Sequence, residues 1–303
     1  MTAGEPGRVQ PKTVSGPIAS RYKESIAVVR RNRNGFVRSC VVYDEWFVSM
    51  SKQAPQNGTI KTAHRVFDTL ELVRDRESVT LSEVAEELDI ATSTAHGYLT
   101  TLEDIGYLVR DDGRFHLSLT FIQYGKAAKS HLKYLKFVEP VVEKIADETG
   151  EVASFVAEEN GEAVFLLRKE GSDAAYTSAE RGKQAPLHAT AAGKVILANQ
   201  SETRIEELTL SEHTNRTITD VEVLHTEIDE VREEGLAYND REYLPGLRAV
   251  SCPVYNDDEL IGTVTVGGPA KRLHGEIFHQ EIPALLRGKT NEIELNLNGT
   301  YDI

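Results

Sequence analysis

The chain has few of the residues that support covalent or metal chemistry. Only two of its 303 residues are cysteine, Cys40 and Cys252, which argues against a disulfide framework and a structural zinc site. It also contains no G-x-S-x-G, H-E-x-x-H or P-loop motif and no paired metal-ligand spacing. We therefore predict a protein that is not an enzyme and needs no cofactor or metal ion. Cys252 lies in an apolar run, so we expect it in the core rather than as a nucleophile.

Long hydrophobic runs are also missing. No apolar stretch approaches the roughly 18 residues that span a membrane, and no signal peptide is evident. The hydrophobic content of 40% is nevertheless enough for ordinary cores, and 303 residues leave room for two domains. We expect a soluble cytoplasmic protein with no membrane partner.

The strongest pattern lies in residues 80–117, where two short helices precede a hairpin. The first helix has apolar residues at i, i+3, i+4 and i+7, namely Leu81, Val84, Ala85 and Leu88. Thr80 and Glu83 have the spacing of a capping box at the start of this helix. An earlier helix, over about residues 62–73, offers a third apolar face.

The second helix ends at a glycine that leads into the hairpin. Its apolar stripe consists of Ala95, Leu99, Leu102 and Ile105. Gly106 then stands where a left-handed C-cap is expected. The run Asp111-Asp112-Gly113 joins two short strands and is a strong hairpin signal. This order predicts a winged helix-turn-helix over residues 59–118.

The exposed face of the second helix carries small or polar side chains that can form hydrogen bonds. A recognition helix presents such residues, near its N-terminus, to base edges and phosphates. The alternative is a solvated polar helix in an ordinary helical domain. The candidate DNA contacts are Thr92, Ser93, Thr94, His96, Tyr98 and Thr101.

Charge counts against DNA binding. The chain holds 34 basic and 48 acidic residues, for a net charge of −14, and residues 61–117 hold six basic and twelve acidic ones. A DNA-binding domain normally shows a basic footprint. A salt-rich cytoplasm would resolve the conflict, because at molar salt the Debye length is roughly 3 Å and repulsion is screened. We therefore hypothesise a halophilic archaeal source.

Residues 1–58 differ from the rest. The first 49 hold eight basic and four acidic residues, and the opening stretch is rich in Gly, Pro and Ser. One interpretation is a basic arm that clamps DNA. The other, which we favour, is a disordered tail, or upstream sequence translated from a misplaced start, with Met50 as the true initiator.

The second half follows an α/β pattern. A helix within residues 119–133 is expected to link the domains, and residues 134–303 alternate helical and strand-like runs. Turn signals at residues 159–161 and 256–258 predict two hairpins. We expect a mixed sheet flanked by helices.

Three segments of this half could form a binding site. They are residues 186–194, rich in small side chains that let a helix start approach an anion, the polar connection 238–248, and the strand end 265–269. For each segment alone, a packing turn or a charged surface edge is the simpler interpretation. His188 alone fits a structural hydrogen bond better than a ligand contact.

Together these motifs resemble the IclR family of transcriptional regulators, from about Ile60 to the C-terminus. The resemblance rests on S-T-A-H-G-Y-L-T-T-L-E-D-I-G-Y-L, on L-H-A-T-A-A-G-K-V-I-L-A and on G-L-A-Y-N-D-R-E-Y-L-P-G-L-R-A-V-S-C-P-V, in that order. It implies an α+β chain with an N-terminal winged helix-turn-helix, a linker helix and a GAF-like α/β domain that binds an effector and supports oligomers.

The resemblance also implies a function. It describes a homodimer or tetramer that binds a palindromic operator in double-stranded DNA and responds to a small metabolite, such as a carboxylate or an aromatic or sugar-derived acid. It adds Arg110 and Arg114 of the wing as phosphate contacts. It implies an effector pocket formed by His188, Ala191, Ala192, Gly193, Asn239, Asp240, Gly246, Leu247, Thr265 and Gly267.

One position departs from the family pattern. The family usually has arginine after the histidine of S-T-x-H, whereas this chain has Gly97. Arginine can contact guanine or a phosphate, and glycine costs about 1 kcal/mol in a helix interior. The alternative function is therefore a GAF-like small-molecule sensor or enzyme with a vestigial helix-turn-helix.

Overall fold

The computed structural model describes residues 29–31, 37–39, 59–174 and 181–299. Within the N-terminal unit, β1 (Val29–Arg31) and β2 (Val37–Ser39) form an antiparallel pair. The rest of residues 1–58, including Met50, lies outside the described residues. The predicted tail and the predicted start at Met50 therefore stay predictions.

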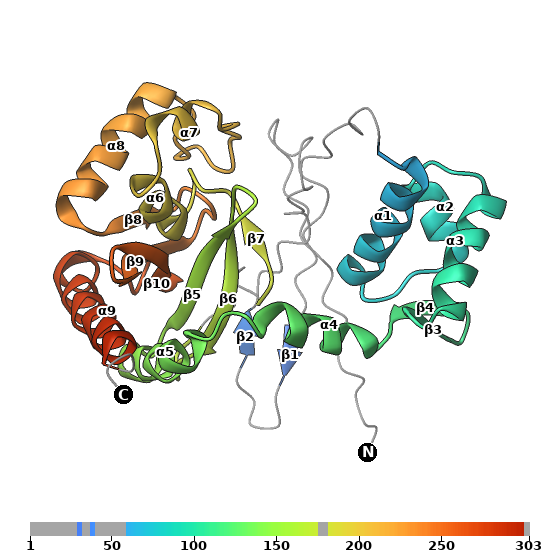
Figure 1. Cartoon of the computed structure of the whole chain (residues 1–303), viewed down its shortest axis with the longest axis horizontal. Helices are drawn as coiled ribbons and strands as arrows, with labels where there is room; N and C mark the ends of the chain where they lie inside the picture. Colours follow the sequence, from blue (N-terminus) through green and yellow to red (C-terminus); the bar gives the residue numbers. More distant parts are fainter. Residues whose placement is uncertain (1–28, 32–36, 40–58, 175–180, 300–303) are drawn as a thin grey trace, which may run out of the picture. The chain divides into compact units, whose positions relative to one another are not determined.

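Three helices and a hairpin follow, as the sequence predicts (Figure 1). They are α1 (Lys61–Asp75), α2 (Leu81–Glu87), α3 (Thr92–Asp104), β3 (Leu108–Asp111) and β4 (Arg114–Leu117). One apolar cluster holds them together, with Val73, Val84 and Leu99 among its buried members. The capping box is confirmed, because Glu83 N donates to Thr80 Oγ1 at 3.3 Å and Thr80 N donates to Glu83 Oε2 at 2.6 Å.

The end of α3 sets the start of the wing. Gly106 has φ of +81°, and the main chain closes with Gly106 N donating to Glu103 O and Tyr107 N to Leu102 O. This pair of bonds is a Schellman motif, which confirms the predicted C-cap. Asp112 and Gly113 both have positive φ at the tip of the β3–β4 hairpin, as a type I′ turn requires.

Two helices lead from the winged helix to the C-terminal domain. α4 (Thr120–Lys129) buries none of its residues, whereas α5 (Leu135–Thr149) has an apolar stripe that is fully buried. Among the described residues, no helix is both long enough and apolar enough to cross a membrane.

The C-terminal domain is built on one six-stranded sheet. Its strands are β5 (Val152–Glu159), β6 (Glu162–Glu170), β7 (Gln184–Ala185), β8 (Ala237–Asp240), β9 (Leu247–Asn256) and β10 (Glu259–Pro269). They run in the order β7-β6-β5-β10-β9-β8, and every neighbouring pair is antiparallel. The prediction of a mixed sheet was therefore wrong. The β5–β6 and β9–β10 hairpins lie side by side, and β5 of the first pairs antiparallel with β10 of the second.

Helices cover both faces of this sheet (Figure 1). α5 and α9 (Ile282–Asn298) pack on one face; α6 (Ala191–Ala198) packs on the other, with α7 (Glu202–Glu206) and α8 (Val221–Glu234) beyond it. A π-helical turn, η1 (Ile277–Glu281), precedes α9. This arrangement is the expected α+β, GAF-like architecture.

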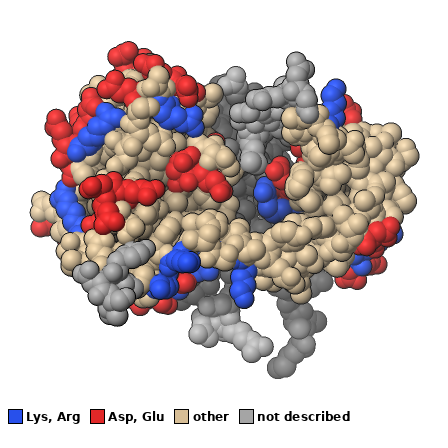
Figure 2. Space-filling view, in the orientation of Figure 1, with Lys and Arg blue, Asp and Glu red and all other residues tan. Residues whose placement is uncertain are grey.

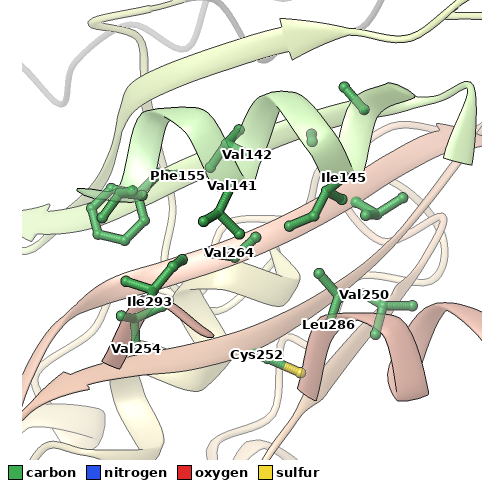
Figure 3. Close-up of a cluster of buried hydrophobic side chains, with 14 of the residues drawn as sticks. Val141, Val142, Ile145, Phe155, Val250, Cys252, Val254, Val264, Leu286 and Ile293 are labelled. Carbon is green, nitrogen blue, oxygen red and sulfur yellow. The ribbon is translucent and has the colours of Figure 1, made fainter. Parts of the chain in front are cut away.

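The main core lies between the sheet and the pair α5 and α9. Figure 3 shows Val142 and Ile145 of α5 facing Phe155 and Val264 of the sheet. Cys252 belongs to this cluster, as the sequence predicts, and burial raises the pKa of its thiol to about 12. Strand residues one position along face the other way, toward α6.

We predict that Thr80→Ala lowers the free energy of unfolding by about 1 kcal/mol, because the main-chain N–H of Glu83 loses its acceptor, the Thr80 hydroxyl. Urea unfolding followed by circular dichroism measures this loss. The main-chain bond from Thr80 is the largest of the causes that lower the pKa of Glu83. The stability that this bond contributes is therefore fully present above the usual pKa of a glutamate carboxyl, and it is lost as the pH falls through the lowered pKa of Glu83. Thr62→Ala, at an exposed position of α1, is the control and should change little.

Candidate DNA-binding and effector-binding sites

The exposed face of α3 is polar and carries no cation. Thr92, Ser93, Thr94 and His96 are exposed there, and Tyr98 is half-buried. Thr101 is exposed as well, but its hydroxyl donates to the main-chain oxygen of Gly97 at 2.7 Å. The helix contains no Lys or Arg and ends in Glu103 and Asp104. Any contact with DNA through α3 must therefore use hydrogen bonds and shape rather than charge.

Most basic side chains of the winged helix are already paired within it. Four arginines contact carboxylates, in the pairs Arg65–Asp68, Arg74–Asp75, Arg76–Glu87 and Arg114–Glu83. Of the basic side chains in residues 59–118, all of which the structure describes, only those of Lys61 and Arg110 have no carboxylate partner. On the face shown in Figure 2, most of the surface of this domain is uncharged.

The two arginines of the wing differ in what they contact. Arg110 is exposed and lies 5.2 Å from the ring centre of Phe115, with its guanidinium free of carboxylates in the described structure. Arg114 instead reaches back to Ser78 at 2.8 Å and to Glu83 at 3.1 Å, so it braces the capping box of α2. Of the two predicted phosphate contacts, Arg110 is the one whose charge is available.

A cavity lies in the C-terminal domain between the sheet and the start of α6. The centre of a water molecule can move through about 80 Å³ of it, which is room for a few water molecules. Its lining is mostly apolar and comprises Val152, Ser154, Phe165, Thr190, Ala191, Ala192, Asn239, Tyr243, Leu244, Leu247, Arg248, Ala249, Thr265, Gly267 and Gly268.

The polar groups of the cavity can donate hydrogen bonds. Thr190 caps α6 by accepting from Gly193 N at 3.1 Å, which leaves the N–H groups of Ala191 and Ala192 without an intrahelical acceptor. Ser154 is 2% exposed, and its hydroxyl has no hydrogen-bond partner among the described residues. Burial raises the pKa of Tyr243 to about 12, so its phenol stays protonated. An anionic oxygen would satisfy these donors.

The single cation in the lining is committed elsewhere. Arg248 Nε donates to Asp240 at 2.6 Å, Nη1 donates to the main-chain oxygen of Leu273 at 3.0 Å, and the guanidinium lies 5.0 Å from the ring centre of Phe278. The cavity therefore offers neutral donors and a helix N-terminus, with little free positive charge.

Six of the ten predicted effector contacts line the cavity. They are Ala191, Ala192, Asn239, Leu247, Thr265 and Gly267. The other four, His188, Gly193, Asp240 and Gly246, lie outside the lining, and contacts within the chain account for each of them.

Packing accounts for His188 and Gly193. A side chain at Gly193 would overlap the main chain of Leu187, so α6 can pack there only with glycine. His188 is buried, and its Nε2 is 3.0 Å from Ser211 O. Burial lowers the pKa of His188, which keeps the ring neutral.

Asp240 and Gly246 belong to the loop region after β8. Asp240 is bonded to Arg216, Arg241 and Arg248, and the bonds from Arg241 and Arg248 hold the pKa of its carboxyl well below its usual range. Gly246 accepts a main-chain bond from Ala270 N at 2.8 Å. Both residues shape the segment that carries Tyr243, Leu244 and Leu247 to the cavity.

A buried lysine, which the sequence analysis missed, fastens this segment to α6. Lys194 is 1% exposed, and its Nζ donates to Glu227 at 2.7 Å, to Glu242 at 2.9 Å and to the main-chain oxygen of Tyr238 at 3.0 Å. Burial raises the pKa of Glu242, and the nearby ammonium opposes that rise. The available signal was a lysine inside the otherwise apolar run of residues 191–198.

Acidic side chains gather on the C-terminal domain over α7 and α8 (Figure 2). On α8 the exposed acids are Glu222, Asp229, Glu230, Glu233 and Glu234. They face solvent and contribute to the net charge of −14. Among the described residues, no group of three or more potential metal-binding side chains occurs.

Two family models match the chain, one for each domain. The model of the IclR helix-turn-helix domain matches residues 62–112, and that of the bacterial transcriptional regulator IclR C-terminal domain matches residues 126–294. The second match covers more than half of the 303 residues.

Individual proteins agree with the family models. A probable HTH-type transcriptional regulator ArcR of Halobacterium salinarum is 29% identical over 260 residues, which cover 82% of this chain and 99% of the relative. The crystal structure of Thermotoga maritima IclR superposes with a TM-score of 0.65 at 26% identity, covering 78% of this chain and 98% of that one. An IclR homologue of Microbacterium hydrocarbonoxydans, solved with 4-hydroxybenzoate, has a TM-score of 0.68 at 22% identity, covers 78% and 99% of the two chains and shows the fold alone.

These matches remove the alternative of an enzyme, because the family consists of transcriptional regulators. The chain belongs to the IclR family of transcriptional regulators, with a helix-turn-helix domain followed by an effector-binding domain.

Proposed function

We propose that the protein binds a palindromic operator as a dimer and that a small carboxylate in the cavity of the C-terminal domain changes its affinity for that operator. The cavity is the observation that carries the proposal. It combines two free N–H groups at the start of α6 with the unpartnered hydroxyl of Ser154 in apolar surroundings. Such a site binds an anionic head group and a short apolar body.

The size of the cavity favours small acids. Because the space open to the centre of a water molecule is only about 80 Å³, we propose a short hydroxy acid as the ligand in preference to a sugar-derived acid. The larger aromatic acid 4-hydroxybenzoate, with which the Microbacterium homologue was solved, is included in the test for comparison.

The DNA contacts that we propose are Thr92, Ser93, Thr94, His96 and Tyr98 of α3, together with Arg110 of the wing. All of them except Tyr98 are exposed. The hydroxyl of Thr101 and the guanidinium of Arg114 have internal partners, so both side chains contribute mainly to the shape of the domain. As a transcription regulator of an archaeon or a bacterium, the protein would act in the cytoplasm.

The linker helix supports the proposed dimer. None of the residues of α4 is buried, and Leu119, Ile122 and Tyr124 are 81%, 67% and 53% exposed. A second copy that covers Leu119 and Ile122 would bury apolar surface that this chain leaves exposed.

The proposal is tested by selecting duplexes from a random-sequence pool with the full chain. Fluorescence anisotropy then gives the affinity for the enriched duplex with and without lactate, gluconate or 4-hydroxybenzoate. We expect an enriched palindrome and a response to the smallest acid. An enriched sequence without two-fold symmetry, or no response to any of the acids, contradicts the proposal.

We predict that Arg110→Gln weakens DNA binding and lowers the slope of log Kd against log salt by about 1, because one phosphate contact is lost. Arg114→Gln is the matched variant and should instead lower the free energy of unfolding, because Ser78 and Glu83 lose their partner. Equal salt slopes for Arg110→Gln and the wild type would exclude Arg110 as a phosphate contact.

We predict that Ser154→Ala weakens the binding of the responsive acid about tenfold, because a hydrogen bond to a charged group is lost. The folded protein should lose no stability, since this hydroxyl has no partner among the residues that the structure describes. Ser251→Ala is the contrast, because the hydroxyl of Ser251 lies 2.8 Å from Thr265 Oγ1 and its loss should cost about 1 kcal/mol of stability. Isothermal titration and thermal unfolding measure the two effects, and unaltered acid binding by Ser154→Ala would count against the site.

We predict that the folded protein becomes more stable between ~0.1 M and molar KCl, because salt screens the repulsion within a chain of net charge −14. Urea unfolding at a series of KCl concentrations measures the trend. Full stability at ~0.1 M KCl would rule out the salt adaptation that we infer.

A further inference from the structure

We propose that Gly97 is a specificity-determining residue of α3, at which the main chain of the helix touches the operator directly. This inference rests on the proposed function, because it requires α3 to be the helix that reads DNA. At Gly97, which has no side chain, the protein would come closest to the DNA.

Nothing within the described chain requires glycine at this position. Gly97 lies inside α3 and has no positive φ, and a Cβ added to it would meet no atom within 4 Å. Glycine is nevertheless among the least favourable residues in a helix interior. Gly193 of α6 shows the opposite case, because a side chain there would overlap Leu187. The reason for Gly97 therefore lies outside the chain.

The position of Gly97 matches a contact with the groove. It is exposed, lies in the N-terminal half of α3, and shares a helix face with Ser93, Thr94 and Thr101 by its spacing of three or four residues. These neighbours have small side chains. With no side chain at Gly97 and small ones around it, the edge of a base pair can approach the main chain of the helix there.

The main-chain carbonyl of Gly97 keeps a hydrogen-bond partner when water is removed from it. Its carbonyl oxygen accepts the Thr101 hydroxyl at 2.7 Å, in addition to the N–H group of the helix. An exposed carbonyl in a helix usually completes its hydrogen bonding with water, and removing that water costs free energy unless a partner remains. Thr101 supplies the partner, so DNA can cover Gly97 without leaving an unsatisfied acceptor.

The charge of α3 makes such an approach necessary. The helix has no Lys or Arg, and four of the six basic residues between positions 61 and 117 are paired with carboxylates. Long-range attraction to phosphates is therefore weak. Dispersion contacts and hydrogen bonds act only at short range, and removing one side chain from the interface brings the helix within that range.

The test uses the duplex that the full wild-type chain enriches from a random pool. Gly97→Ala should bind this duplex about tenfold more weakly, because even one methyl group overfills a close contact. The thermal unfolding midpoint of the variant should rise by about 2–4 °C, since alanine favours the helix. Weaker binding by a more stable protein is not expected from a merely structural role.

Two further variants sharpen the result. Gly288→Ala makes the same change at an exposed position inside α9, where a Cβ also meets nothing within 4 Å, and should keep wild-type DNA binding. Gly97→Arg adds the cation that α3 lacks, and we expect it to bind more weakly than Gly97→Ala.

The inference is overturned if Gly97→Ala binds as tightly as the wild type, or if Gly97→Arg binds more tightly. In either case the wild-type chain still binds its duplex, and the proposed function stands. A wild-type chain that enriches no duplex overturns both. Selection repeated with Gly97→Ala should enrich a sequence that differs at one or two positions of each half-site.

Discussion

The bonds of the Lys194 ammonium group are the interaction on which the C-terminal domain depends. This buried cation joins α6 to α8 through Glu227, to the segment after β8 through Glu242, and to the main chain of β8. Removing one partner from such a cluster typically costs 3–5 kcal/mol, because a charge is left buried and uncompensated. The same bonds hold Tyr243 and the start of α6 on two sides of one cavity, so the geometry of the binding site and the stability of the domain share one origin.

A second constraint is that most basic residues of the winged helix already have carboxylate partners within it. In this domain four of the five arginines are paired with carboxylates, and Arg114 braces the Thr80–Glu83 cap. Few positive charges remain for DNA, and the recognition helix has none. A protein organised in this way gains little from counterion release, so it suits an environment in which salt has already removed most of that gain.

Local signals allowed the winged helix to be predicted almost completely, because its cap, its Gly106 terminus and its Asp112-Gly113 turn each depend on a few neighbouring residues. The sheet of the C-terminal domain was less predictable. β5 pairs with β10, more than one hundred residues later, and no local pattern encodes that pairing or its direction. Ser154 and Phe165 were missed as cavity residues for this reason. Gly193, predicted as an effector contact, lies against Leu187 outside the cavity lining, and small residues serve both tight packing and ligand approach.

The Schellman motif at Gly106 has a consequence for regulation. Two main-chain bonds fix the angle at which the wing leaves α3, and the hairpin that follows is too short to bend independently. Each winged helix therefore holds α3 and the wing in one fixed arrangement. In the proposed dimer, a ligand in the C-terminal domain would therefore alter the spacing between the two winged helices and leave unchanged the sequence that each of them binds.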